Sequence, residues 1–228
     1  NTSIFEKLKQ GSVLLGKIAR IAKGSESGNN DIFTVTEDTV KKYKIEKDII
    51  RKCIKNSNIK KYFIEYKGLF LLYADNDFVP SVFKYSYEYL KNYKSQLLNR
   101  RGPLHQEYEW YRLHRPSIKE VFDADEKLVV PYRAERNCFA YDNNQYFNNG
   151  GDIRAIVLKD GVELSIKYLL GLLNSKLLDW HYGFIGKPKG KAREYFNEPL
   201  SLIPIKRISL AEQQPFIALV NQILTAKK

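Results

Sequence analysis

The apolar residues of this chain fall into short runs that alternate between strand-like and helix-like spacing. Compact runs such as KLVVPY (127–132) and RAIVL (154–158) are typical of buried strands, whereas longer segments repeat apolar residues with helical periodicity. No run approaches the ~20 apolar residues that a membrane-spanning helix needs. The pattern favours an α+β fold, in which a twisted, largely antiparallel sheet is flanked by helices and followed by a C-terminal amphipathic helix.

Short strands are expected at several further places along the chain. The segments 13–21 and 31–35 read as strands around the polar loop KGSESGNN, and 138–141 and 200–205 read as later ones. The sequence KYFIEYKGLFLLY (61–73) predicts a hairpin that turns at Lys67-Gly68, because glycine accommodates a sharp reversal. The sheet is therefore expected to consist of short strands joined by turns.

After a Thr36 cap, residues 37–54 are expected to form one broken helix or two short ones. Further helices are expected at 81–99, between Pro80 and Gly102-Pro103, and after a Ser165 cap. The last of these is expected to bury one stripe: Leu169, Leu170, Leu173, Leu177 and Trp180. Ser209 and Glu212 have capping-box spacing, so a terminal helix should begin there, with Pro215 forcing a late start or a kink. We expect residues 1–208 to form one domain and 209–228 a helix that packs on it or on an absent partner.

The positive charge of the chain is concentrated. Of the net charge of +12, the segment 41–61 carries +7 and the segment 187–193 carries +4, so the rest is nearly balanced. Lysine runs are often only solvated surface. Two concentrated basic segments in a balanced chain nevertheless favour a polyanionic partner, and neither has the apolar face that a membrane-surface helix needs.

The sequence lacks the usual signatures of catalysis and metal binding. Cys53 and Cys138 form no Cys-x-x-Cys pair, which predicts reduced thiols in a cytoplasmic protein. The three histidines do not pair at helical spacing, and no Gly-rich phosphate-binding motif or Gly-x-Ser-x-Gly elbow occurs. We therefore expect no catalytic residue, no metal site and no cofactor within these 228 residues.

One pattern loosely matches a nuclease site. Asp48 followed by Glu65-Tyr66-Lys67 resembles the metal-binding Asp and Glu-x-Lys of many nucleases. That chemistry requires both carboxylates to converge on one Mg²⁺, with the lysine near the attacked phosphate. Asp48 falls in an expected helix and Lys67 in an expected turn, so the interpretation as a nuclease site is disfavoured.

Six blocks occur along the chain in an order that is more specific than any one of them. They are GKIARIAKGSESGNNDIF (16–33), IIRKCIKNSNIKKYFIEYKGLFLLY (49–73), NRRGPLHQEYEWYRLHRP (99–116), KLVVPYRAERNCFAYDNNQYF (127–147), YLLGLLNSKLLDWHY (168–182) and the segment that ends in LSLIPI (200–205). Together they resemble the TaqI-like C-terminal specificity domain, the target-recognition module of adenine-specific DNA methyltransferases and single-chain restriction-modification enzymes. Ser27 stands where this family usually has Thr, and Asn56-Ser57-Asn58 replaces its Gly-x-Asp.

The resemblance implies a role in choosing a DNA sequence. The module would bind double-stranded DNA, so that a linked or associated methyltransferase domain extrudes and methylates an adenine. In the family that amino-terminal domain uses S-adenosylmethionine and carries a Gly motif and an Asn-Pro-Pro-Tyr/Phe loop, neither of which occurs here. Because neither motif occurs, the chain is expected to be the specificity part alone, which is consistent with the absence of methionine even at position 1.

Two sets of residues are candidates for DNA contacts. Phosphates are expected to meet basic residues: Lys60, Lys61, Arg100, Arg101, Lys187, Lys189 and Lys191. Base edges are expected to meet polar loop residues and two arginines: Ser25, Ser27, Asn29, Asn30, Arg133 and Arg136. Salt bridges to Glu135 or Asp142 are an equally supported interpretation of the two arginines. Arg112 and Arg115, which follow Trp110 and Tyr111, fit a structural role better than a stacking one.

Two other function classes remain open. In a protein-interaction module, the C-terminal helix and an aromatic surface would dock a partner, and the charge would only favour solubility. In an RNA-binding module, exposed aromatic side chains on a sheet would stack on bases, and Tyr62, Phe63 and Tyr66 are the candidate cluster.

Overall fold

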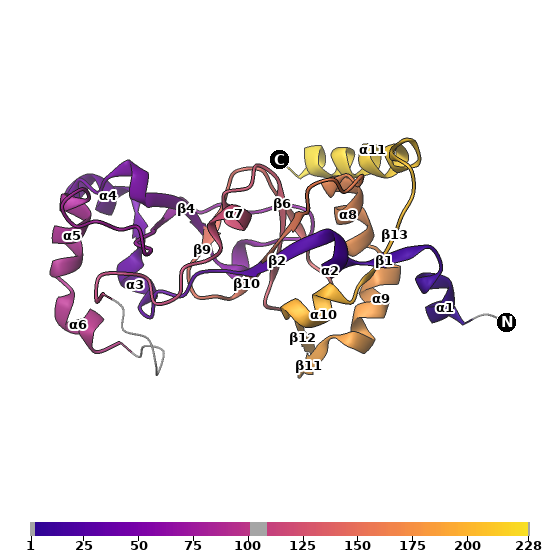
Figure 1. Ribbon diagram of the computed structural model, residues 1–228, viewed down its shortest axis with the longest axis horizontal. Helices are drawn as coiled ribbons and strands as arrows, with labels where there is room; N and C mark the ends of the chain where they lie inside the picture. Colours follow the sequence, from indigo (N-terminus) through magenta and orange to yellow (C-terminus); the bar gives the residue numbers. More distant parts are fainter. Residues whose placement is uncertain (1–2, 101–108, 228) are drawn as a thin grey trace.

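The computed structural model describes residues 3–100 and 109–227, which form an elongated molecule with one lobe on each side of a central sheet (Figure 1). The strands of this sheet, in spatial order, are β2 (Ala19–Lys23), β10 (Ile153–Leu158), β6 (Lys127–Pro131) and β8 (Ala140–Asp142). All three pairings are antiparallel. Arg101 and the Gly102-Pro103 stop signal lie outside the described residues.

Both faces of the central sheet are buried, each against a different core. Successive side chains of a strand point to opposite faces. Leu128 and Val130 accordingly belong to the core of one lobe, whereas Val129 between them belongs to the core of the other. The alternation explains why β6 appears in the sequence as an uninterrupted apolar run.

The first lobe contains a mixed sheet and several short helices. Its strands, in spatial order, are β3 (Thr34–Thr36), β5 (Leu69–Leu72), β4 (Ile50–Ile54) and β9 (Phe147–Asn148), of which β4 and β9 are parallel. Its helices are α3 (Asn30–Phe33), α4 (Glu37–Tyr43), α5 (Lys84–Lys91), α6 (Lys94–Leu98) and α7 (Lys119–Phe122), with 3₁₀ turns η1 (Lys47–Ile49) and η2 (Asn56–Asn58).

The second lobe contains both ends of the described chain. Its helices are α1 (Ile4–Lys9), α2 (Leu15–Ile18), α8 (Ile166–Leu173), α9 (Lys176–Ile185), α10 (Asn197–Ser201) and α11 (Leu210–Ala226). Strand β1 (Ser12–Leu14) pairs with β13 (Pro204–Lys206), and β11 (Lys187–Lys189), β12 (Ala192–Glu194) and β7 (Arg133–Ala134) form a separate antiparallel ribbon.

The α+β class with mostly antiparallel strands is confirmed, although the described residues form several open sheets instead of one. Strands β6 and β10 lie where the apolar runs predicted them. The capping predictions are also confirmed, since the hydroxyl groups of Thr36, Ser165 and Ser209 accept hydrogen bonds from backbone amides of the first helical turns. No helix in the described ranges is both long and apolar enough to cross a membrane.

Several predicted elements of the first half are wrong. The predicted helical segment 37–54 does break, at Tyr43, but its last part is strand β4 instead of a second helix, and this strand pairs with β5 and β9. The hairpin at Lys67-Gly68 does not form, because β5 pairs with β3 and β4 instead of with the residues just before it. The segments 13–21 and 31–35 are each interrupted by a helical turn, α2 and α3, which buries Leu15, Ile18, Ile32 and Phe33.

Two predicted helices are broken. The helix over 81–99 begins only at Lys84 and is interrupted at Asn92-Tyr93. The helix after Ser165 is interrupted at Asn174-Ser175, where the Asn174 amide bonds both backbone groups of Phe139. The break turns Leu177 and Trp180 outward, so the expected stripe is buried only in α8.

The C-terminal helix begins directly after its Ser209 cap and packs on the second lobe. Helix α11 starts at Leu210 with Pro215 inside it, so the late start is wrong. The Gln213 side chain bonds the backbone of Glu163, Ser165 and Ile208, and the Phe216 ring lies 5.4 Å from that of Tyr168. The division at residue 208 into two units stays a prediction.

Candidate nucleic-acid interface

A basic ribbon extends from the central sheet where β7, β11 and β12 pair. Strand β7 begins two residues after β6, and Figure 1 shows β11 and β12 hanging below the sheet. Lys187, Lys189 and Lys191 are exposed on this hairpin. Their ammonium groups lie free of carboxylates within the described residues, apart from a 3.9 Å contact between Lys187 and Glu194. The ribbon therefore presents exposed, weakly paired cations that could contact a phosphate backbone.

Arg133 stands on the same ribbon and is paired with a buried carboxylate. Its guanidinium donates to the Glu194 Oε1 atom from Nε at 2.9 Å and from Nη2 at 2.7 Å. These hydrogen bonds hold the pKa of Glu194 below its ordinary value. Half of the Arg133 side chain remains exposed, so the pair anchors the residue while one edge of its guanidinium faces solvent.

Arg136 joins a second network around Asp179, the first acidic residue of α9. The Arg136 Nη1 atom lies 3.1 Å from one carboxylate oxygen, and the Arg193 Nη2 atom lies 2.6 Å from the other, which also accepts from the Asn137 amide. Burial opposes the charge of Asp179, but these hydrogen bonds outweigh it and keep the pKa below its ordinary value. The salt bridges considered for Arg133 and Arg136 exist, with Glu194 and Asp179 as partners instead of Glu135 and Asp142.

Most side chains of the polar loop after β2 are engaged in hydrogen bonds within the protein. Ser25 and Ser27 are wholly buried: the Ser25 hydroxyl donates to Ser117 Oγ, and the Ser27 hydroxyl donates to Asn30 Oδ1. The Asn29 side chain caps α3 by accepting from the Ile32 amide. This arrangement counts against both serines as base-reading residues and leaves Asn30 as the exposed polar side chain of the predicted set.

Arg100 has a structural position instead of an open one. Its guanidinium donates to the carbonyl oxygens of Ser27, Trp110 and Arg112 and stacks over the Phe33 ring at 5.3 Å. Gly28 follows Ser27 with a positive φ of 75°, and a Cβ there would lie 3.1 Å from Arg100. Arg100 therefore fastens the loop 25–29 to the segment 110–112, which counts against a role as a phosphate contact.

We expect the substitution Arg100→Ala to loosen this loop. Removing hydrogen bonds from a charged donor and leaving carbonyls unpaired should lower the free energy of unfolding by about 1–3 kcal/mol. Urea denaturation measures the change, and Arg136→Ala is the control because the Arg136 side chain is 84% exposed. Equal, small losses for both variants would contradict the role given to Arg100.

Lys60 and Lys61 lie beside the β8 edge of the central sheet. The neighbouring Tyr62 forms a bridge with Ala140 of β8, and β8 and β2 are the two edge strands. Both lysines are exposed and have no carboxylate partner among the residues that the structure describes. The predicted phosphate set is thus divided between the ribbon at one end of the sheet and the β8 edge, and Arg101 lies outside the described residues.

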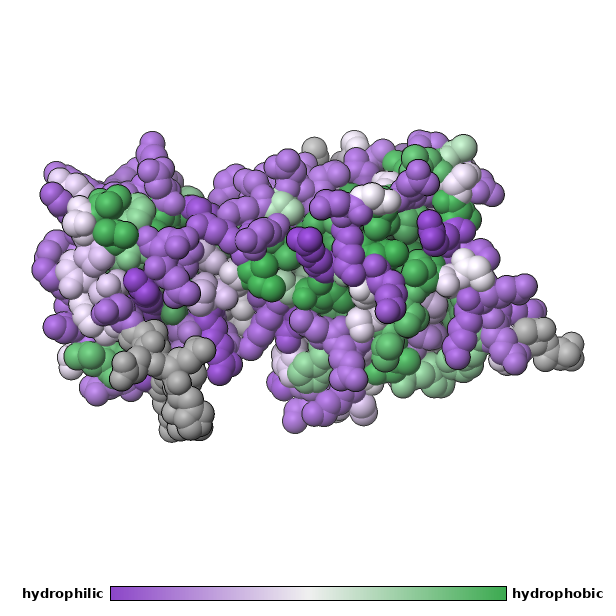
Figure 2. Space-filling model, in the orientation of Figure 1, coloured by the Kyte–Doolittle hydropathy of each residue, from purple (hydrophilic) through white to green (hydrophobic). Residues whose placement is uncertain are grey.

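The ribbon and the polar loop emerge from the same end of the central sheet. Lys23 pairs with Arg154, and Ile153 pairs with Pro131, so the ends of β2 and β6 and the start of β10 are adjacent. The Tyr132 amide donates to the Asp152 carbonyl, which continues this end toward β7. Figure 2 shows hydrophilic surface at the middle of the lower side of the molecule, next to an apolar area on the second lobe. Sequence reasoning could not foresee this juxtaposition.

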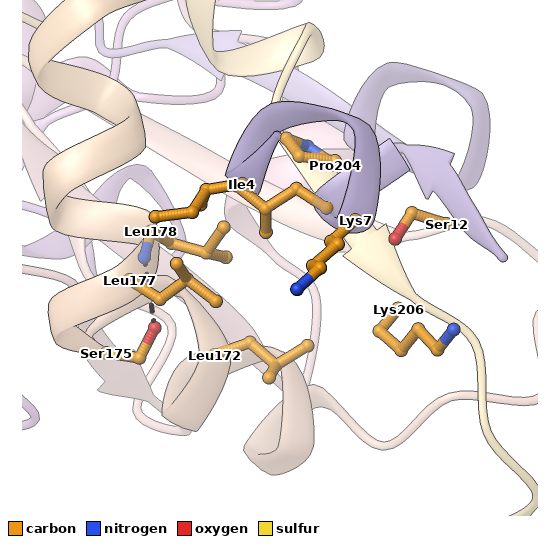
Figure 3. Close-up of a pocket in the computed structure, with 10 residues that line it drawn as sticks. Ile4, Lys7, Ser12, Leu172, Ser175, Leu177, Leu178, Pro204 and Lys206 are labelled. Carbon is orange, nitrogen blue, oxygen red and sulfur yellow. Dashed lines mark hydrogen bonds between the residues drawn. The ribbon is translucent and has the colours of Figure 1, made fainter. Parts of the chain in front are cut away.

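An apolar surface lies on the second lobe. The rings of Phe5, Trp180 and Phe184 contact one another at centroid distances of 4.8–5.3 Å and are all substantially exposed. Figure 3 shows an adjoining pocket of about 360 Å³, where Ile4 of α1 faces Leu172 and Leu177. Its lining is mainly aliphatic, which suits an apolar contact better than catalysis.

Other candidate chemistries have little support among the described residues. No group of three or more His, Cys, Asp or Glu side chains there is arranged to hold a metal ion. Glu65 is paired with Lys67 at 2.5 Å. Tyr62, Phe63 and Tyr66 are half-buried and lie outside the strands, so they do not form an open stacking platform.

The described residues form a mixed α+β module in which the basic ribbon and the polar loop leave the same end of the central sheet. Residues 51–205 match the family model of the TaqI-like C-terminal specificity domain. The chain belongs to this family.

Curated relatives carry related names. The type II methyltransferase M.MjaIV of Methanocaldococcus jannaschii is 26% identical over 186 residues, which are 78% of this chain and 61% of that protein. The type II restriction enzyme and methyltransferase RM.Eco57I of Escherichia coli is 32% identical over 81 residues, 34% of this chain and 8% of that protein. The match thus spans less than two thirds of either relative.

Solved structures share the fold. The type IIG restriction endonuclease BpuSI superposes on 94% of this chain and 26% of its own with a TM-score of 0.61 and 15% identity. The type IIL restriction-modification enzyme MmeI, solved in complex with DNA, superposes on 92% of this chain and 28% of its own with a TM-score of 0.60 and 11% identity. At these identities the likeness shows the fold alone.

Proposed function

We propose that this chain binds duplex DNA and selects a short sequence for an adenine-specific DNA methyltransferase or restriction-modification enzyme. The observation that carries the proposal is the basic ribbon, which lies at the same end of the central sheet as the polar loop. Phosphate contacts from the ribbon would supply affinity and register, and the loop would meet base edges in a groove. Membership of the specificity-domain family supports this division of labour.

Within this proposal the predicted residues have unequal support. Lys187, Lys189 and Lys191 are the strongest phosphate contacts because they are exposed and weakly paired, and Lys60 and Lys61 would extend the contact across the sheet. Arg133, Arg136 and Asn30 are the strongest base contacts, since each is exposed and fixed by a neighbouring group.

The reaction itself would belong to another domain. The names of the relatives support a linked or associated methyltransferase domain that binds S-adenosylmethionine and methylates the selected site. The two free cysteines fit a reducing compartment, and burial raises the pKa of the Cys53 thiol to about 12. A cytoplasmic location is therefore part of the proposal.

Competition binding tests the class of ligand. A labelled DNA duplex bound to the chain is challenged with unlabelled duplex DNA, single-stranded DNA or single-stranded RNA of the same length. We expect duplex DNA to compete best, because the ribbon and loop are suited to a groove flanked by two backbones. Preferential competition by RNA would contradict the proposal.

The apolar surface of Phe5, Trp180 and Phe184 favours one alternative, a module that binds only protein. In that case the chain would bind no nucleic acid at low salt. The competition experiment therefore separates the two functions, because its first step requires a labelled duplex to bind.

A further inference from the structure

A shallow hollow of about 400 Å³ lies beside the polar loop. Glu26, Gly28, Asn30, His114 and Gly150 line it, so three separate segments of the chain converge there. The segments are fixed to one another, because the amides of Gly150 and Gly151 both donate to the Ser25 carbonyl at 2.8 Å. The hollow is thus a built feature of the loop cluster.

Glu26 is the acidic side chain that lines this hollow, and neighbouring residues bind both its backbone and its carboxylate. Its backbone forms an antiparallel bridge with Arg115, with N···O distances of 2.8 and 2.7 Å. Its carboxylate accepts from the Lys23 ammonium and lies 3.3 Å from the Arg115 Nη1 atom. A quarter of the side chain remains exposed, so the carboxylate is positioned by its neighbours and still open to a ligand.

The Glu26 carboxylate is ionised at neutral pH. Burial opposes ionisation, but Lys23, Arg115 and the nearby His114 outweigh burial, and the pKa of Glu26 lies below its ordinary value. An ionised carboxylate only accepts hydrogen bonds. DNA phosphates would repel such an anion, and the two neighbouring cations offset part of that repulsion. A hydrogen-bond donor on a base edge would then give the carboxylate a favourable contact.

The hydrogen-bond donors on base edges indicate which base a carboxylate can recognise. In the major groove, cytosine presents its N4 amino group without an adjacent acceptor, whereas adenine presents N6 beside the acceptor N7. A carboxylate therefore suits cytosine, while the Asn30 amide next to it, which can donate and accept, suits a neighbouring base. The hollow lies at the sheet end from which the basic ribbon also extends, so one duplex can reach both.

We propose that Glu26 is a specificity-determining residue that accepts a hydrogen bond from the N4 amino group of a cytosine in the target sequence. The proposal rests on the proposed DNA-binding function and assigns its selectivity to a residue outside the predicted base-reading set. Arg115 acts on Glu26 as a positioning residue through the backbone bridge and the ion pair.

Selection from a pool of duplexes with a randomised centre tests this assignment. We expect the unchanged chain to enrich a motif with at least one required cytosine, and Glu26→Gln to lose the preference at one such position while retaining the others. Each good base contact contributes about 1–3 kcal/mol of discrimination, so the preference should fall roughly 5- to 150-fold at that position. Glu65→Gln is the matched control, because Glu65 is an exposed, ion-paired glutamate that does not line the hollow, and it should leave the motif unchanged.

The outcomes separate the two levels of the account. If the unchanged chain binds no duplex, the proposed function fails. If it binds and enriches a motif that Glu26→Gln leaves intact, only the assignment to Glu26 is overturned. The affinities of the unchanged chain and of Glu26→Gln for the unselected pool are measured alongside, and equal affinities show that the variant is folded. If Glu26→Gln no longer binds the pool, Glu26→Asp replaces it. This variant keeps the charge and should change the base preference at the same position of the motif.

Discussion

The substitution Lys127→Met is expected to lower the free energy of unfolding by about 3–5 kcal/mol, because it leaves a buried carboxylate without its counter-charge. Lys127 and Asp142 are both fully buried, and their charged atoms lie 2.7 Å apart. Lys127 also donates to the Phe122 carbonyl, while Asp142 accepts from the amides of Asn144 and Tyr146. The pair therefore joins β6, β8 and two adjoining turns in the centre of the molecule.

Urea denaturation followed by circular dichroism measures this loss. The matched control is Lys41→Met, since Lys41 is paired with Glu37 on the surface of α4 and both side chains are about two thirds exposed. Exposed pairs of this kind contribute little, so the control should unfold close to the unchanged chain. Similar midpoints for Lys127→Met and the control would show that the buried pair does not have the structural role given to it.

The triple substitution Lys187→Ala, Lys189→Ala and Lys191→Ala is expected to weaken binding to every duplex alike. Each phosphate contact contributes about 0.9 to the slope of log K against log salt, so the slope should shrink by up to about 2.7. If binding converges at about 1 M salt, this corresponds to a loss of up to roughly 500-fold at about 0.1 M. Stability should not change, because these side chains are exposed.

The control removes the same charge from the first lobe, through alanine at Lys42, Lys47 and Lys52, which are also exposed. Equal losses for both triple variants would mean that overall charge, and not the ribbon, sets the affinity. A loss confined to one sequence would mean that the ribbon lysines read bases instead of contacting phosphates.

The parts of the fold that follow from local chemistry could be predicted from the sequence. The hydroxyl caps at Ser165 and Ser209 need only the next turn of helix, and β6 needs only a run of apolar residues. Strand β4 was mistaken for helix because Ile49, Ile50, Cys53 and Ile54 have helical spacing. It pairs with β9, nearly a hundred residues later, and this pairing favours the strand over the helix. The residues of β4 themselves give no sign of such a distant partner.

The candidate interface divides in the same way. The basic run 187–193 is local, and the sequence alone identified it. The burial of Ser25 depends on Ser117, 92 residues away, and a polar loop looks the same whether its hydroxyl groups face inward or outward. Glu26 was overlooked for the converse reason, since its position depends on Arg115 and on a hollow formed by three distant segments.

Titration of the chain against a short DNA duplex over a range of salt concentrations tests the central claim most directly. With about five to eight phosphate contacts, log K is predicted to fall linearly with log salt at a slope of about −4.5 to −7. Absence of binding at low salt, or an affinity that hardly responds to salt, would contradict the account of this chain as a DNA-recognition module.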